Sequence, residues 1–258
     1  MRLWFRRSQP AIDDPTWAAV QRRAALLRQL DPEQLQRLRT LSERFLRRKT
    51  IQAVAGLELD ATRRCLIAAL CSLPLLRLPD DWLDDWHEVI VYPGQFRVRR
   101  HDYDEASGVI AEWDDELAGE SWERGPLVLS WADVRADLRR PREGYNVVVH
   151  EIAHKLDGLD GVLDGTPPLS GALRADWVRA CQAAFDDLCT QVDAGHEPPI
   201  DAYAAEAEDE FFAVVSEYHY SAPDVLAAAY PDVAAVLSRF YGPSPWPASA
   251  TAVAVQPA

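Results

Sequence analysis

Residues 145–161, YNVVVHEIAHKLDGLDG, constrain this chain more than any other stretch. They contain the pattern H-E-x-x-H at His150, Glu151 and His154. Side chains four residues apart lie on one face of an α-helix, so the two imidazoles would project side by side and could bind one metal ion. Glu151 would lie about a quarter-turn round the helix, within reach of a water molecule on that metal.

Apolar residues surround this pattern, which favours a buried helix. They are Val147, Val148, Val149, Ile152, Ala153 and Leu156. Gly158 supplies a stop at the C-terminal end of the predicted helix. An unpaired histidine or glutamate would be costly in such surroundings. The segment therefore predicts a metal site and not two coincidental histidines.

The composition is that of a globular protein. The 258 residues are 48% hydrophobic and 26% charged, enough for a substantial core in one large or two small domains. The net charge of −14 argues against direct binding of nucleic acid. We find no apolar stretch of about 18 residues and no secretory signal, so we expect no membrane span. The four cysteines form no C-x-x-C pair and predict free thiols in the cytoplasm.

Local patterns predict an α+β fold, mostly helical, with a small mixed β-sheet. Residues 1–13 are expected to form a flexible tail, and residues 14–80 a helical region packed on the core. Residues 81–242 would form the core that contains the metal site. Residues 243–258 are rich in proline and alanine and are expected to be disordered.

Within the core, three β-branched runs predict strands at residues 87–93, 108–113 and 126–131. Besides the helix of the metal site, helical patterns occupy residues 130–138, 172–192, 204–220 and 223–240.

A catalytic metal site of this type takes three protein ligands, so a third is needed. One candidate is Asp160, six residues after His154, where one class of H-E-x-x-H proteins places a third histidine. The glycine that this class requires three residues after the second histidine is replaced by Asp157, and Gly158 comes one residue late. Asp157 and Asp160 are better explained as groups at the helix end that orient the histidines.

The other candidate is Glu210. The sequence has no glutamate between Glu151 and Glu197, so a glutamate ligand must come from a later helix. Glu210 directly precedes the apolar run FFAVV, where an unpaired carboxylate is costly.

Other polar residues near Glu210 have more than one interpretation. Tyr203 lies seven residues before Glu210, where its phenol could donate to an oxyanion or pack at an interface. Glu206, Glu208 and Glu217 are expected on a solvated face or in contact with the ligands.

Four stretches carry a resemblance to a known family: WHEVIVYP, GPLVLSW, NVVVHEIAHKLDGLDG and IDAYAAEAEDEFFAVVSEYHYSAP. Across residues 15–242 the chain resembles the bacterial family of Mlc titration factor A. These are zinc-dependent peptidases whose catalytic core is similar to the protease domain of anthrax lethal factor. The resemblance implies a zincin-like core, with Zn²⁺ on His150, His154 and Glu210. It also implies Glu151 as the general base and Tyr203 as the oxyanion donor.

Two functions follow from this resemblance. One is a zinc metallopeptidase that hydrolyses a peptide or protein substrate, with aminopeptidase-like activity on small substrates. Exopeptidase and endopeptidase action both stay open, because the sequence has no G-x-M-E-N motif. The other is a regulatory protein that binds and sequesters Mlc, a transcriptional repressor of sugar uptake, with or without cleavage.

Two local features complete the prediction. The strand at residues 126–131 would be the sheet edge along which an extended substrate peptide lies. His219 and Tyr220 replace two phenylalanines that are more frequent in this family, and His219 is expected to be a packing variant.

Overall fold

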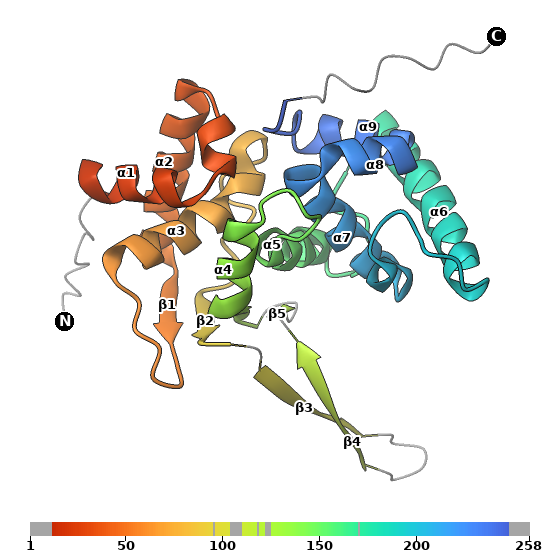
Figure 1. Cartoon of the computed structure of the whole chain (residues 1–258), viewed down its shortest axis with the longest axis horizontal. Helices are drawn as coiled ribbons and strands as arrows, with labels where there is room; N and C mark the ends of the chain where they lie inside the picture. The colour runs from red at the N-terminus through yellow and green to blue at the C-terminus, as the bar shows by residue number, and fades with distance from the viewer. Residues whose placement is uncertain are drawn as a thin grey trace, which may run out of the picture.

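The structure is a computed structural model, and Figure 1 shows its helices and strands. It describes residues 12–94, 96–103, 110–117, 119–121, 125–169 and 171–247. For the described residues between 96 and 121, only the backbone is described. The fold is mostly helical with a small sheet, which confirms the predicted α+β class.

Three helices and two 3₁₀ turns build the N-terminal part: α1 (Asp14–Arg23), η1 (Leu26–Gln29), α2 (Pro32–Arg48), α3 (Ala61–Ser72) and η2 (Leu73–Arg77). Each α-helix begins after an aspartate whose side chain accepts a backbone N–H of the first turn, namely Asp13, Asp31 and Asp60. Such caps satisfy donors that a helix start leaves unpaired. The buried faces of these helices belong to the same hydrophobic core as the helix that carries the histidines.

A four-stranded sheet runs in the order β1 (Thr50–Ala53), β2 (Glu88–Tyr92), β6 (Leu127–Ser130) and β5 (Gly119–Ser121). β1, β2 and β6 are parallel, whereas β5 pairs antiparallel with β6. The strands predicted at residues 87–93 and 126–131 are confirmed as β2 and β6. β1 was not predicted, because residues 14–80 had been expected to be wholly helical.

The position of β6 corrects one expectation. β6 lies between β2 and β5, so it is not a sheet edge, and the prediction that residues 126–131 offer an edge to a peptide was wrong. The three residues of β5 occupy that side of β6. β5 is the outer strand of the described sheet, and it lies against α5.

A second, two-stranded sheet pairs β3 (Phe96–Tyr103) with β4 (Ile110–Leu117) as an antiparallel arm. Figure 1 shows this arm extending away from the helical body. The strand predicted at residues 108–113 falls on β4 from Ile110 onwards, and its first two residues lie outside the described part of the chain.

The remaining elements form the C-terminal part: α4 (Trp131–Arg139), α5 (Val147–Asp157), η3 (Gly158–Asp160), α6 (Gly171–Asp193), η4 (Ala202–Ala205), α7 (Glu208–Ser221), α8 (Pro223–Ala229) and α9 (Pro231–Phe240). The helix predicted at residues 223–240 is two helices, because Pro231 lacks the N–H that a continuous helix needs. α5 and α7 lie side by side, so residues far apart in the sequence meet between them (Figure 1).

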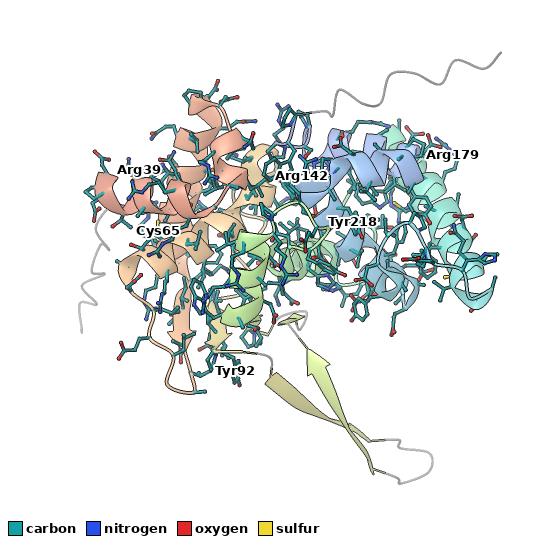
Figure 2. The ribbon with its side chains drawn as sticks, in the orientation of Figure 1. Arg39, Cys65, Tyr92, Arg142, Arg179 and Tyr218 are labelled. Carbon is teal, nitrogen blue, oxygen red and sulfur yellow. The ribbon has the colours of Figure 1, made fainter. Side chains whose placement is uncertain are left out.

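The described C-terminal residues are anchored on this body. Trp246 donates its indole N–H to the backbone oxygen of Tyr220 at 2.7 Å. Arg142, labelled in Figure 2, stacks on the Trp246 ring at 4.9 Å and pairs with Asp224 at 2.8 Å. Trp246 thus packs against the body, although it lies in the segment 243–258 that had been expected to be disordered; residues 248–258 lie outside the described part. No described helix is long and apolar enough to cross a membrane.

Candidate metal centre

The helix α5 presents two histidines toward α7. Its N-cap, Asn146, accepts the backbone N–H of Val149 at 3.2 Å, and the apolar side of the helix is buried in the core. The rings of His150 and His154 lie 4.9 Å apart between centroids, and their Nε2 atoms approach to 3.2 Å. The four-residue spacing therefore places both imidazoles on one face, as the sequence predicted.

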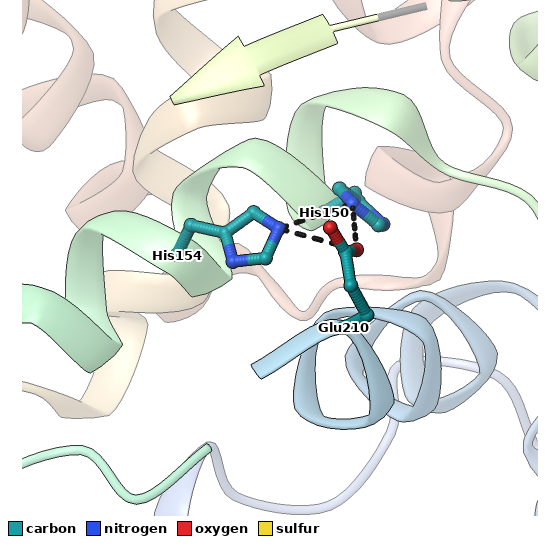
Figure 3. A group of neighbouring side chains, drawn as sticks. All are labelled: His150, His154 and Glu210. Atoms are coloured by element: carbon teal, nitrogen blue, oxygen red, sulfur yellow. Dashed lines mark hydrogen bonds and ion pairs between the residues drawn. The ribbon is translucent and has the colours of Figure 1, made fainter. Parts of the chain in front are cut away.

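The helix α7 brings Glu210 to the same place (Figure 3). Glu210 lies in the first turn of α7, and the two phenylalanines that follow it are buried in the core. Glu210 Oε2 lies 3.2 Å from His150 Nε2 and 3.4 Å from His154 Nε2. Among the described residues, His150, His154 and Glu210 are the one group of potential ligands close enough to hold a metal ion.

The shape of this group fits a small divalent cation. Its three donor atoms form a triangle with sides of 3.2, 3.2 and 3.4 Å. In a tetrahedral site with metal–ligand bonds of about 2.0–2.1 Å, two ligand atoms lie about 3.3 Å apart. Glu210 Oε2 is buried and makes no hydrogen bond of good geometry, despite its short distances to both histidines. These atoms therefore converge on a point where a metal ion could bind.

The electrostatics of the group are those of mutually stabilising charges. Burial alone would lower the pKa of His150, but the carboxylates of Glu210 and Glu217 outweigh it and raise that pKa well above its usual value. Burial alone would raise the pKa of Glu210, yet the two histidines hold it well below the usual range. Glu210 is therefore a carboxylate at neutral pH, the form that binds metals.

Glu151 lies beside this group and is 2% exposed. Its Oε2 atom is buried without a hydrogen-bond partner in the structure. Burial raises the pKa of Glu151 to about 7, against the opposing effect of the two histidines. A buried carboxylate with one unpaired oxygen next to potential metal ligands is suited to accepting a proton.

Tyr203 lies in η4, a short turn before α7, and not at the start of the long helix that the sequence predicted. Its side chain is 40% exposed, its hydroxyl donates to Glu210 Oε1 at 2.9 Å, and its ring lies 6.2 Å from that of His150. Burial and the neighbouring Glu210 raise the pKa of Tyr203 above its usual value. The phenol therefore stays protonated and able to donate.

The alternative third ligand, Asp160, lies elsewhere. It is exposed in η3, and its Oδ1 accepts the backbone N–H of Val162 at 3.2 Å. Asp157 is buried and accepts the backbone N–H of Gly165 at 2.9 Å. Neither aspartate belongs to the group of potential metal ligands.

Gly165 joins three elements that position the centre. Its N–H binds Asp157 at the end of α5, and its carbonyl accepts the indole N–H of Trp177 from α6 at 2.9 Å. It has a φ of +72°, and a Cβ atom there would lie 2.3 Å from the backbone oxygen of Glu208, at the start of α7. Only glycine fits this approach. The contact fixes the spacing between α5 and the first turn of α7.

Sequence reasoning undervalued Glu217 and missed Asp209. Glu217 is buried, and its Oε1 lies 2.9 Å from His150 Nδ1. Asp209 Oδ2 lies 3.9 Å from His154 Nδ1. For Glu217 a signal was present, because it shares a helix face with Glu210 and so faces the same neighbour.

The α+β fold and the convergence of H-E-x-x-H with a glutamate from a second helix define the class of metal-dependent peptidases. The chain belongs to the family described as glucose-regulated metallo-peptidase M90, which matches residues 1–242.

Several relatives that share one name match most of the chain. Mlc titration factor A of Escherichia fergusonii is 36% identical over 245 residues, which cover 94% of this chain and 91% of that protein. The protein of the same name from Cronobacter sakazakii is 39% identical over 224 residues, covering 85% and 83%. That from Escherichia coli is 37% identical over 223 residues, with the same coverage.

Proposed function

We propose that this protein is a zinc-dependent peptidase in which His150, His154 and Glu210 bind Zn²⁺. The triangle formed by their three donor atoms is the observation that carries the proposal. Two imidazoles and one carboxylate form a ligand set that suits zinc and leaves one position for water or substrate. The family to which the chain belongs supports a metallopeptidase.

Zinc at this site would act as a Lewis acid that polarises the scissile carbonyl and makes water a stronger acid. Glu151 then accepts the proton of the attacking water and delivers it to the leaving amine. Its buried position and its unpaired Oε2 favour this role, because no competing donor occupies that oxygen.

Tyr203 supplies the hydrogen-bond donor for the oxygen of the scissile carbonyl. Its hydroxyl reaches Glu210 Oε1 at 2.9 Å, so a turn of the side chain away from that carboxylate brings it to a substrate bound beside the centre. Its exposure leaves room for this turn. A donor placed where negative charge develops stabilises the transition state.

An extended peptide would pair with β5. This strand is the outer strand of the described sheet and lies against α5, which carries Glu151. Backbone pairing with such a strand holds a substrate without requiring a particular sequence. The proposal therefore concerns peptide or protein substrates.

A peptide-library cleavage assay with and without a chelator tests this function. We expect cleavage by the protein as purified, loss of cleavage with chelator, and recovery when zinc is added back. Cleavage that survives complete removal of metal would contradict the proposal, as would a zinc-loaded protein that cleaves no peptide in the library.

The names of the relatives favour a second function, binding of an Mlc-like transcriptional repressor. We propose it as a role that coexists with hydrolysis. The four free cysteines suit the reducing cytoplasm, where such a repressor acts. A pull-down with wild type and Glu151→Gln tests it. Equal capture of the repressor by both would show that binding is independent of cleavage, and no capture by either would exclude this second role.

A further inference from the structure

The helix α7 carries a second carboxylate that reaches His150 from the side opposite Glu210. Glu217 follows Glu210 by seven residues, which is about two helical turns, so both side chains face α5. Glu210 Oε2 lies 3.2 Å from His150 Nε2, and Glu217 Oε1 lies 2.9 Å from His150 Nδ1. The imidazole of His150 is thus held between two glutamates of one helix.

Both oxygens of Glu217 are used. While Oε1 contacts His150, Oε2 accepts the backbone N–H of Asn146, the N-cap of α5. The residue is 7% exposed, so water competes little for either oxygen. The carboxylate is therefore fixed relative to α5 at two points, and its position determines the orientation of the His150 ring.

We infer that Glu217 is a positioning residue of the centre, which keeps a proton on His150 Nδ1 and so leaves Nε2 free to bind the metal. The inference rests on the proposed function, because it assigns His150 as a ligand. A carboxylate can only accept at Oε1, so the nitrogen that faces it must carry the hydrogen. Glu210 Oε2 also faces the ring, but its contact with Nε2 is longer, 3.2 Å, and lacks hydrogen-bond geometry, so in the neutral ring Nε2 keeps its lone pair toward Glu210 and His154.

His154 has no comparable partner among the described residues. The nearest carboxylate to its Nδ1, that of Asp209, lies at 3.9 Å, beyond hydrogen-bonding distance. The effect should therefore be specific to His150.

Glu217→Gln isolates this role because it keeps the shape and removes one acceptor. If the amide oxygen faces His150, the amide NH₂ faces the N–H of Asn146, and two donors oppose each other. If the amide turns over, its NH₂ faces His150 Nδ1 and favours the tautomer with the hydrogen on Nε2. Either orientation weakens the site, whereas a simple packing role would tolerate this change of equal volume.

The test measures the His150 tautomer and the zinc affinity of the full chain. In metal-free protein with ¹⁵N-labelled histidine, at a pH that keeps the ring neutral, we expect the Nδ1–H tautomer in wild type and a shift toward Nε2–H in Glu217→Gln. Zinc affinity should fall by about 10–100-fold, as for other partners of metal-binding histidines. Glu197→Gln, the same chemical change at an exposed loop residue, should match wild type.

The outcomes separate the two proposals. A wild-type protein that does not bind zinc contradicts the proposed function, while the tautomer of His150 still decides the role of Glu217. An Nε2–H tautomer in wild type overturns the inference even if Glu217→Gln does not fold. So does a folded Glu217→Gln that keeps the wild-type tautomer and zinc affinity.

Discussion

Tyr203 donates its phenolic hydrogen to Glu210 Oε1 across 2.9 Å, while the other oxygen of that carboxylate faces the two histidines. One residue of the proposed oxyanion site is thus tied to one proposed ligand of the metal. The contact holds the phenol beside a proposed metal ligand.

This relationship leads us to expect that Tyr203→Phe lowers kcat for peptide hydrolysis by about 10²–10³-fold, the usual effect of removing one oxyanion donor. Zinc content should stay at the wild-type level, because Glu210 keeps the oxygen that faces the histidines. Steady-state kinetics with metal analysis measure both quantities. Tyr230→Phe removes a phenol that also donates to a carboxylate, that of Asp187 at 3.3 Å, but outside the proposed site, so it serves as the matched control and should keep kcat within about 3-fold. Unchanged kcat in Tyr203→Phe would remove this residue from the mechanism.

The two candidates for the third ligand can be separated by substitution. Glu210→Gln should lose most of the bound zinc, because a neutral amide replaces the carboxylate that completes the triangle. Asp160→Asn should retain it, because Asp160 is exposed and binds only its own turn. Metal content after dialysis measures zinc retention in both variants. Loss of zinc in Asp160→Asn but not in Glu210→Gln would instead support Asp160 as the third ligand.

Gly165 should be intolerant of a side chain. Gly165→Ala adds a Cβ atom 2.3 Å from the backbone oxygen of Glu208 in a left-handed conformation. Gly161→Ala also requires a left-handed conformation, with φ of +90°, but its Cβ atom would meet no atom within 4 Å. We expect Gly161→Ala to lower the free energy of unfolding by about 1 kcal/mol, and Gly165→Ala by at least about 2 kcal/mol more.

Urea denaturation measures the free energy of unfolding of both glycine variants. Both variants place alanine in a left-handed conformation, so the difference between their free energies reports the steric clash at Gly165 alone. Zinc affinity should fall in Gly165→Ala alone, because of these two glycines only Gly165 contacts the first turn of α7. Equal losses of unfolding free energy in the two variants would show that the loop around Gly165 moves to accommodate the added Cβ atom.

Stability should depend on pH through His219. This residue is buried, its Nε2 atom has no hydrogen-bond partner, and burial lowers its pKa from 6.5 to about 4. Below pH 6.5 the unfolded chain takes up a proton that the native state refuses, so stability is present above that pH and is lost as the pH falls toward 4. The contribution is at most about 3 kcal/mol, since each pH unit between the two values corresponds to about 1.4 kcal/mol.

His219→Phe should reduce this loss of unfolding free energy at acid pH, because a phenyl ring of similar size does not titrate. Unfolding free energies measured from pH 7 to pH 4 give the slope for each protein. His196→Phe, at an exposed histidine, should keep the wild-type slope. Parallel curves for wild type and His219→Phe would show that the native state accommodates the charged ring.

The parts of the fold that could be predicted from the sequence depend on local patterns. The α5 helix was predictable because its apolar periodicity and its H-E-x-x-H spacing lie within one segment. β1 was not, because its four residues form a strand only by pairing with β2, and the paired residues, such as Thr50 and Glu88, are 38 positions apart in the sequence. The strand order of the sheet could not be predicted either, because β5 is three residues long and its sequence has no strong β pattern.

The same distinction applies to the centre. Glu210 could be singled out because an acidic residue at the start of an apolar helix is costly unless it is paired. The helix face that Glu217 shares with Glu210 could be recognised from the sequence, but its contact with His150 Nδ1 depends on how α7 packs against α5, which no local pattern specifies. The pairing of Tyr203 with Glu210 required the short turn η4, which the sequence had merged with the following helix.

The most direct test of a zinc-dependent peptidase compares Glu151→Gln with wild type in one experiment that measures zinc content and peptide hydrolysis. The substitution leaves His150, His154 and Glu210 unchanged, so we expect one zinc ion per chain, as in wild type. Hydrolysis should fall by at least about 10³-fold, because an amide cannot accept the proton of the attacking water. A variant that keeps both its zinc and the wild-type rate of cleavage would contradict the role of Glu151 and the mechanism built on it.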